Sequence, residues 1–305
     1  MPQLEVRNLV KRYGKTVAVD DLSFTVEPGR VTGFLGPNGS GKTTTMRALL
    51  GLLRPSAGDA LVDGQPPVAM GDPLRTIGAA LEATAFHPGR NGRNHLRSLA
   101  AAADIPRSRV EEVLEMVELS GAPAKRRVKG YSLGMRQRLA LAAALLGEPR
   151  ILILDEPANG LDPQGMRWLR DLLREQAAGG RTVLVSSHLL SEVSQTADDL
   201  VVIRDGKLVS QGSLAELTAS ARSMLRVRAT NLDELAAALR EAGAGVESED
   251  GGALLVGGLD GERIGDLALG RGIAIHELAP QQASLEDRFF ELMGDGESGG
   301  GGEGE

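Results

Sequence analysis

A glycine-rich segment at residues 36–44 carries the clearest chemical pattern of the sequence. It reads G-x-x-x-x-G-K-T, in which glycines let successive backbone N–H groups point inward at an anion. The apolar stretch Val31–Leu35 predicts a buried strand just before it, and helical spacing predicts a helix over Lys42–Leu53. The segment therefore predicts a phosphate-binding loop for a nucleoside triphosphate, because a helix N-terminus adds free donors and a positive dipole end.

Two side chains of this loop have specific predicted roles. Lys42 brings a positive charge to the β- and γ-phosphates, which makes it a catalytic candidate, and Thr43 offers a hydroxyl to Mg²⁺. The residues of the loop that we expect to bind the nucleotide are Gly36, Asn38, Gly39, Ser40, Gly41, Lys42, Thr43 and Thr44. The alternative is a glycine-rich turn that matches by chance, and the flanking strand and helix argue against it.

Two adjacent carboxylates follow a second apolar strand, predicted over Ile151–Leu154. A strand beside the loop's strand delivers its C-terminal carboxylate to the metal, so Asp155 is predicted to bind Mg²⁺. Glu156 comes next and is predicted to act as the general base that polarises the attacking water. His188 follows a third predicted strand, Val183–Ser186, where a neutral imidazole can hydrogen-bond the γ-phosphate and hold that water. Adjacent acids after a strand are otherwise typical of a helix N-cap.

The elements that position these residues predict an α/β fold. Leu4–Val10 and Leu22–Val26 alternate as strands of an antiparallel edge, whereas Asp72–Gly147 is predicted to be mainly helical. Buried strands that alternate with helices imply a mostly parallel sheet.

The pattern of predicted helices and strands changes after about Leu217. The predicted order is strand, helix, hairpin, helix, strand and helix, at Met224–Ala229, Leu232–Ala242, Gly245–Gly257, Glu262–Leu269, Ile273–Leu278 and Ser284–Met293. This order is typical of a small ferredoxin-like sandwich. The alternative is an irregular extension around the main domain. Residues 294–305 hold only glycine, acidic residues and one serine, and predict a disordered acidic tail.

Composition limits the remaining classes of function. The 305 residues contain no cysteine, which excludes a disulfide scaffold, a cysteine-ligated zinc site and an iron–sulfur cluster. The net charge of −7 argues against broad, non-specific nucleic-acid binding. No apolar stretch approaches the ~20 residues that a bilayer requires, and the N-terminus lacks a signal-peptide pattern. We therefore expect a cytosolic chain that reaches a membrane only through a partner.

Taken in order, these features resemble the ATP-binding subunit of an ABC transporter. Residues 131–138 resemble the family signature, and residues 159–162 resemble the D-loop that follows the paired acids. Tyr13 lies where the family places an aromatic ring that stacks on adenine. The resemblance covers about Leu4–Leu217. Within the family the chain is similar to ATPases of bacterial bacitracin, lantibiotic and antibiotic-resistance exporters.

The resemblance implies a P-loop NTPase core with a mainly parallel sheet, an antiparallel β subdomain and a helical subdomain at about residues 83–147. Residues 1–217 would form the ATPase domain, and residues 218–293 a C-terminal accessory α+β domain. Whether that domain stabilises a dimer or regulates activity stays open.

The resemblance also implies an activity and its partners. The chain would bind ATP and Mg²⁺ and hydrolyse ATP as a head-to-tail homodimer at the cytoplasmic face of the membrane. Ser132 and Gly134 of one copy would face the ATP held by the other copy, and Asp162 would lie close by. A separately encoded permease would move an antibiotic, a drug or lipid-like cargo. The groove for that permease is expected around Phe86, His87, Pro88 and Leu96, with ordinary packing of these residues as the alternative.

Three features depart from the family pattern. Leu133 and Met135 replace a glycine and a glutamine of the signature, and Glu82 stands where the Q-loop glutamine is expected. A carboxylate accepts hydrogen bonds but cannot donate them. Glu82 is still predicted to contact the nucleotide, and Mg²⁺ through water; it could instead raise the free energy of the ATP-bound state or take a proton. Tyr13 could also be a half-buried strand-end residue.

Two other classes of function compete with this hypothesis. ABC ATPases that act on nucleic acid or ribosomes usually carry tandem modules, a long coiled coil or cysteine zinc sites, none of which this sequence has. A regulator that has lost catalysis would fit the altered signature and Glu82. The presence of Asp155, Glu156 and His188 argues against such a regulator.

Overall fold

The computed structural model describes residues 3–81, 86–219, 224–249 and 252–281. The chain divides into two compact units, with the division after Leu214. Each unit has its own cluster of buried apolar side chains. No helix in these described ranges is both long enough and apolar enough to cross a bilayer.

A six-stranded sheet forms the centre of the first unit, in the order β5-β6-β7-β3-β8-β9. In that order the strands are Ile77–Ala80, Ile151–Leu154, Thr182–Ser187, Val31–Leu35, Asp199–Arg204 and Lys207–Ser213. All neighbours pair in parallel except β8 and β9, which are antiparallel. Every residue of β3 and β6 is buried, as their continuous apolar runs require. The prediction of a mainly parallel sheet is confirmed.

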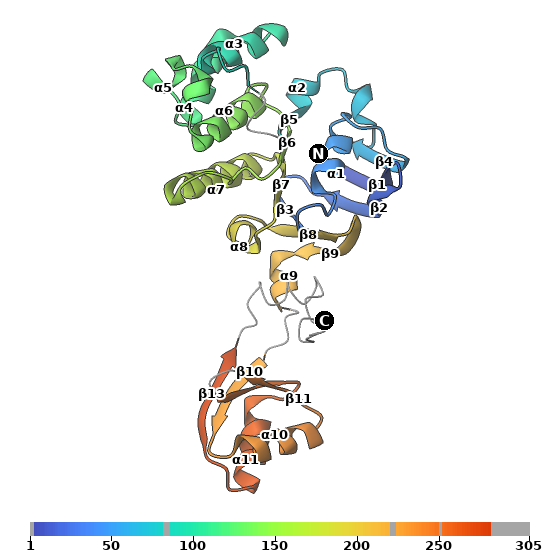
Figure 1. The fold of residues 1–305 in the computed structure, drawn as a ribbon, viewed down its shortest axis with the longest axis vertical. Helices are drawn as coiled ribbons and strands as arrows, with labels where there is room; N and C mark the ends of the chain where they lie inside the picture. Colours follow the sequence, from blue (N-terminus) through green and yellow to red (C-terminus); the bar gives the residue numbers. More distant parts are fainter. Residues whose placement is uncertain (1–2, 82–85, 220–223, 250–251, 282–305) are drawn as a thin grey trace, which may run out of the picture. The chain divides into compact units, whose positions relative to one another are not determined.

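A second, antiparallel sheet has the order β2-β1-β4 and consists of Thr16–Val26, Leu4–Tyr13 and Ala57–Val62. Helix α1 (Lys42–Leu49) lies between this sheet and the six-stranded one (Figure 1). The buried side chains between the two sheets include Met46 of α1 and Phe24 and Phe34, whose ring centroids are 5.2 Å apart. This core fixes α1, and with it the phosphate loop, to both sheets.

Helices gather on the other side of the six-stranded sheet (Figure 1). They are α3 (Gly92–Ala102), α4 (Arg107–Met116), α5 (Ala122–Lys125), α6 (Leu133–Leu145) and α7 (Pro163–Ala178). The shorter helical segments of the first unit are η1 (Pro67–Ala69), α2 (Pro73–Thr76), η2 (Val128–Gly130) and α8 (Leu190–Val193). Helix α9 (Leu214–Ala219) begins at the last residue of this unit. The helical and antiparallel subdomains expected from the family are both present.

Two sequence expectations for the first unit need correction, and some of its strands had no prediction. Ile77–Ala80 lies within the stretch expected to be mainly helical, yet it forms strand β5 beside β6. The neighbouring strand determines the conformation of this segment, because pairing with β6 buries Ile77. The helix expected over Lys42–Leu53 ends at Leu49. Strands β8 and β9 had no sequence prediction, although Asp205-Gly206 between them is a common hairpin turn.

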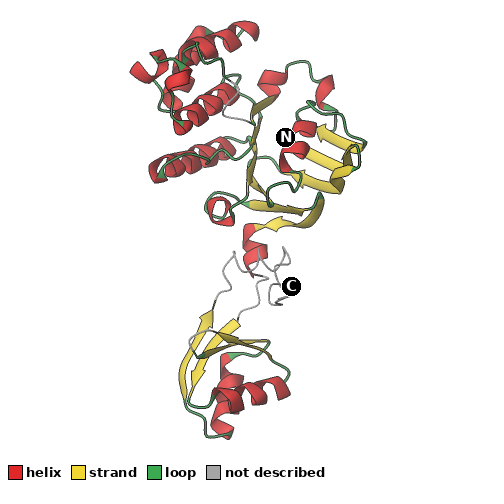
Figure 2. Ribbon diagram, in the orientation of Figure 1, coloured by secondary structure: helices red, strands yellow, loops and turns green. Residues whose placement is uncertain are grey.

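The second unit has the strand order β11-β12-β10-β13, with all neighbours antiparallel. Its elements are β10 (Met224–Ala229), α10 (Leu232–Glu241), β11 (Gly245–Glu249), β12 (Ala253–Gly257), α11 (Gly261–Gly270) and β13 (Ile275–Gln281). Both helices cover the same face of the sheet (Figure 2). This is the ferredoxin-like arrangement that the sequence predicted. The helix expected at Ser284–Met293 and the tail at residues 294–305 lie outside the described residues.

Candidate functional site

The phosphate loop is shaped by close backbone approaches that only glycine permits. Gly41 has φ +104°, and a Cβ there would lie 2.6 Å from the carbonyl oxygen of Ala18. A Cβ on Gly36 would lie 2.5 Å from the carbonyl oxygen of Ile203 on β8. The turn after β8 also holds the loop, because the Gly206 N–H donates to the Ser40 carbonyl oxygen at 3.0 Å. Helix α1 then begins without a side-chain cap, which leaves its first N–H groups for an anion.

Lys42 holds its ammonium inside the curve of this loop. Its Nζ donates to the carbonyl oxygens of Gly36 at 2.6 Å and Pro37 at 3.1 Å, and it lies 3.8 Å from Glu156 Oε1. Burial lowers the pKa of Lys42, and the nearby carboxylates of Glu156 and Asp155 oppose that shift. The lysine is thus partly desolvated, which strengthens its attraction to a phosphate.

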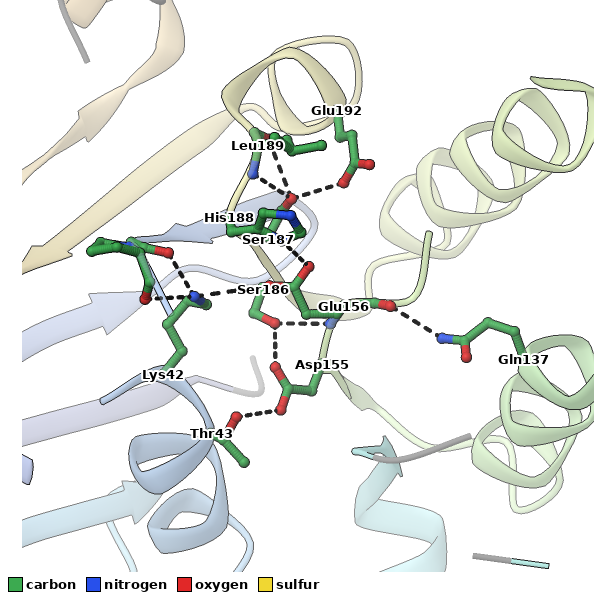
Figure 3. Close-up of polar contacts among 12 residues, drawn as sticks. Lys42, Thr43, Gln137, Asp155, Glu156, Ser186, Ser187, His188, Leu189 and Glu192 are labelled. Carbon is green, nitrogen blue, oxygen red and sulfur yellow. Dashed lines mark hydrogen bonds and ion pairs between the residues drawn. The ribbon is translucent and has the colours of Figure 1, made fainter. Parts of the chain in front are cut away.

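Asp155 and Glu156 are held by a serine that the sequence analysis did not assign to the site. Ser186, at the end of β7, donates from Oγ to Asp155 Oδ1 and accepts from the Glu156 N–H at 2.9 Å (Figure 3). Thr43 Oγ1 donates to the other oxygen of Asp155 at 2.7 Å. The sequence signal that could have identified Ser186 is its position, because it follows the apolar part of the strand and precedes Ser187 and His188.

Glu156 has an unusual backbone conformation and contacts residues from several other segments. Its φ is +48°, in the left-handed region that costs a non-glycine residue about 1–3 kcal/mol. The Glu156 carbonyl oxygen accepts from Gln137 Nε2 on α6 at 3.3 Å, and its Oε2 lies 2.9 Å from His188 Nδ1 (Figure 3). The predicted base, histidine and lysine therefore lie together, although they come from three different strand ends.

A cavity of about 240 Å³ lies at this cluster, and the residues expected to bind the nucleotide line most of it. Its lining consists of Ala18, Asn38, Gly39, Gly41, Lys42, Thr43, Thr44, Leu81, Asp155 and Glu156. Ser40 is buried beside it, and its Oγ has no hydrogen-bond partner among the described residues. An unsatisfied buried hydroxyl beside a basic side chain and free helix donors fits a phosphate group.

The same cavity also fits Mg²⁺. In the described part of the chain, no group of three or more His, Cys, Asp or Glu side chains is placed to hold a metal ion. Mg²⁺ does not require such a group, because it binds through one or two protein oxygens plus phosphates and water. Thr43 Oγ1 and Asp155 Oδ2 are adjacent oxygens of the kind it uses.

The signature and D-loop residues lie outside this cavity. Ser132 caps α6 by accepting from the Met135 N–H at 3.2 Å, and Asp162 caps α7 by accepting from the Gly165 N–H at 2.7 Å. Neither they nor Gly134 appear in the cavity lining. The two segments touch each other, because Leu133 packs against Gly160 of the D-loop.

Three further predicted positions have different outcomes. Tyr13 is the last residue of β1 and is 50% exposed, with Lys11 Nζ 5.1 Å from its ring centroid, so the half-buried strand end and the adenine contact both stay compatible with its position. Glu82 lies outside the described residues. In the expected permease groove, Phe86 packs edge-on against His95, but Leu96 is fully buried. The expectation of an exposed contact is therefore wrong for Leu96, which serves the core of the helical subdomain.

The fold and this cluster define a phosphate-loop nucleotide-binding protein. The family model described as ABC transporter matches residues 19–159, and a domain of unknown function matches residues 223–286. The chain is 36% identical over 295 residues to an uncharacterized ABC transporter ATP-binding protein, YhcH, of Bacillus subtilis (strain 168), with 96% of each chain covered. It is also 36% identical over 304 residues to the bacitracin transport ATP-binding protein BcrA of Bacillus licheniformis, covering 97% of this chain and 99% of the relative.

Solved structures agree with these relatives. The structure of an ATP binding subunit of an ABC transporter superposes with a TM-score of 0.64 at 27% identity, over 71% of this chain and 92% of that one. The chain belongs to the family of ABC transporter ATP-binding proteins, and it is an ATP-binding subunit of that class.

Proposed function

We propose that this chain hydrolyses ATP as a head-to-tail homodimer and thereby drives a separate membrane permease. The observation that carries the hydrolysis is the position of Glu156. Its carboxylate contacts His188, lies 3.8 Å from Lys42 and borders the phosphate cavity. A carboxylate in that position can act as a general base toward a water beside the terminal phosphate.

Glu156, Lys42 and His188 have different roles in the proposed hydrolysis. Glu156 takes a proton from water while the water oxygen bonds to the γ-phosphorus and the bond to the bridging oxygen breaks, giving ADP and phosphate. Lys42 stabilises the charge on the transferred group. When Nδ1–H donates to Glu156, His188 keeps Nε2 to accept a hydrogen bond from the water, or to donate one to the γ-phosphate if the ring carries a second proton. Thr43 and Asp155 would hold Mg²⁺, with Glu82 contributing through water, and the bound ion would neutralise further phosphate charge.

The dimer follows from the placement of the signature. Ser132 and Gly134 lie at the start of α6, outside the cavity that their own chain forms. A triphosphate benefits from further donors, and the N-terminus of α6 in a second copy offers them. In this arrangement ATP joins two subunits, Asp162 and Tyr13 contact the nucleotide from either side, and hydrolysis separates the subunits.

The partner and the cargo are inferred from the relatives. One relative that matches almost end to end is a bacitracin transport ATP-binding protein. We therefore infer a bacterial exporter of antibiotic, drug or lipid-like cargo, with residues 1–217 as the ATPase domain and residues 218–293 as an accessory domain. The chain would then lie at the cytoplasmic face of the membrane through its permease.

Replacing the base tests the proposal. In Glu156→Gln, phosphate release should fall by about 10²-fold or more, the usual contribution of general-base catalysis, while ATP binding persists. With ATP bound and not hydrolysed, the variant should elute as a dimer in light-scattering chromatography. Glu148→Gln is the matched control, because that carboxylate is 65% exposed and lies away from the cavity. Undiminished hydrolysis in Glu156→Gln would contradict the role of Glu156.

A further inference from the structure

A second hollow lies in the first unit, away from the phosphate loop. Its volume is about 440 Å³, and its lining includes residues of helices α7 and α8, the first residue of β3 and the last three residues of β7. No residue lines both this hollow, which we call the α7–α8 cavity, and the nucleotide cavity. Its volume is within the range of small-molecule sites, roughly 300–1,000 Å³.

The buried lining of the α7–α8 cavity is mainly apolar, apart from Ser186 and Ser187. Leu169 and Leu173 of α7, Val185 of β7 and Val193 of α8 line it with buried side chains. At the surface, Met166 and Leu189 also line it and are 39% and 44% exposed. Apolar groups that stay accessible at the mouth of an apolar hollow favour a ligand with a hydrocarbon or aromatic body.

Charged groups among the lining residues favour an anionic end on that ligand. Arg170 and Gln195 both line the cavity, and Arg170 donates to Gln195 Oε1 at 2.7 Å. Arg167 is exposed, and its side chain makes no hydrogen bond or ion pair within the described ranges. The one acidic lining residue, Glu192, already accepts from Ser187 Oγ at 2.8 Å (Figure 3). A guanidinium without a partner is well suited to bind a carboxylate in a bidentate manner.

The walls of this cavity connect it to the catalytic cluster. Pro157 and Ala158 line it and directly follow Glu156 in the chain, and Ser187 lines it and directly precedes His188. Ser186, another lining residue, holds the Glu156 N–H and the Asp155 carboxylate. A ligand in the cavity would therefore press on the segments that carry the base and the histidine.

We propose that the α7–α8 cavity is a regulatory site for an amphipathic monocarboxylate. The apolar body of the ligand packs on Leu169, Leu173 and Val193, and its carboxylate pairs with Arg167 at the mouth. Because the site borders the backbone next to Glu156 and His188, occupancy and ATP turnover are energetically linked.

The binding test uses octanoate with the full chain and no nucleotide. Methyl NMR of the methionines locates the ligand, because Met166 lines the mouth whereas Met46 is buried in the core beside α1. Titration should shift the Met166 signal in a saturable way and leave Met46 unmoved. Arg167→Glu should weaken binding by about tenfold through loss of the charged pair. Arg107→Glu, the same charge change at an exposed position on α4, should bind octanoate as the original chain does.

The regulatory test compares steady-state ATP hydrolysis with and without saturating octanoate. We expect a change in kcat of about twofold or more that is lost in Arg167→Glu, whose basal rate is unchanged. Octan-1-ol, which lacks the charge, should bind less tightly. A Met166 signal that does not move, equal affinity in the two charge-reversal variants, or an unchanged kcat at saturation would overturn the proposal. Failure of the hydrolysis mechanism alone would leave the binding result intact, since that test needs no nucleotide.

Discussion

At the scale of single residues, the hydroxyl of Ser186 bonds to both acidic residues of the candidate site. It is fully buried and bonds to the Asp155 side chain and the Glu156 backbone. Sequence reasoning identified Lys42, Asp155 and Glu156 because their chemistry follows from type and spacing. It passed over Ser186 because a serine at the end of a strand has no characteristic role until its neighbours across the sheet are known.

Ser186→Ala should lower both stability and turnover. The change leaves one oxygen of Asp155 and the Glu156 N–H without this partner, and each buried unsatisfied group costs about 1–3 kcal/mol. We expect the free energy of unfolding in urea to fall by at least about 1 kcal/mol, with a lower kcat. Ser108→Ala, at an exposed position of α4, should stay within about 0.5 kcal/mol of the original chain. Equal stability of the two variants would show that Ser186 does not hold the carboxylates.

His95 should make stability depend on pH. Burial, and secondarily the charge of Arg90, lower the pKa of His95 below its ordinary value. As the pH falls through about 6.5, the unfolded chain takes up the proton before the folded chain does, so the free energy of unfolding decreases. His95→Gln should reduce the loss measured in urea between about pH 7.5 and pH 5.5. His276→Gln, at an exposed position on β13, is the control, and an equal loss in both variants would contradict this.

At the scale of elements, the sequence predicted strands whose pattern lies in their own residues. It missed a strand whose conformation depends on pairing with a neighbouring strand. Strand β3 was predicted because a mostly apolar run precedes the glycine-rich loop, and strand β6 because a continuous apolar run precedes two acidic residues. Strand β5 was missed because Ile-Gly-Ala-Ala has no strand pattern of its own and becomes a strand by pairing with β6. The ferredoxin-like order of the second unit was predictable because its elements are short, alternate regularly and are separated by turn residues.

The contact between the signature and the D-loop can be tested as a contact between two elements. Gly160 has φ +78°, and a Cβ there would lie 2.3 Å from Leu133 Cδ2 at the start of α6. Gly160→Ala should therefore lower the free energy of unfolding by about 2–5 kcal/mol, of which about 1–2 kcal/mol comes from the left-handed backbone and about 1–3 kcal/mol from the crowded side chains that must shift. Adding Leu133→Ala should recover part of that loss.

Gly180→Ala is the matched control for this double-mutant cycle. Gly180 has a similar φ of +85°, but no atom lies within 4 Å of the position of its Cβ. It therefore reports the backbone strain alone, about 1–2 kcal/mol. If the effects of Gly160→Ala and Leu133→Ala are simply additive in urea unfolding, the two segments do not depend on each other.

At the scale of the whole molecule, nucleotide binding should belong to the first unit alone. The candidate site residues from Tyr13 to His188 all precede the division after Leu214, and each unit has its own core. A fragment of residues 1–217 should bind ATP in calorimetry with a Kd within about twofold of that of the full chain. A much weaker Kd would mean that residues 218–305 contribute to the nucleotide site.

The bond between the turn at Gly206 and the loop at Ser40 has a consequence for the order of synthesis. The ribosome makes the phosphate loop early, but the N–H group that holds Ser40 exists only after β8 has been translated. Strand β7, with Ser186 and its neighbour His188, also emerges late. A chain that ends before residue 206 would display the complete glycine motif and yet lack this hydrogen bond, so truncated chains of increasing length should gain ATP binding only when they extend past that residue.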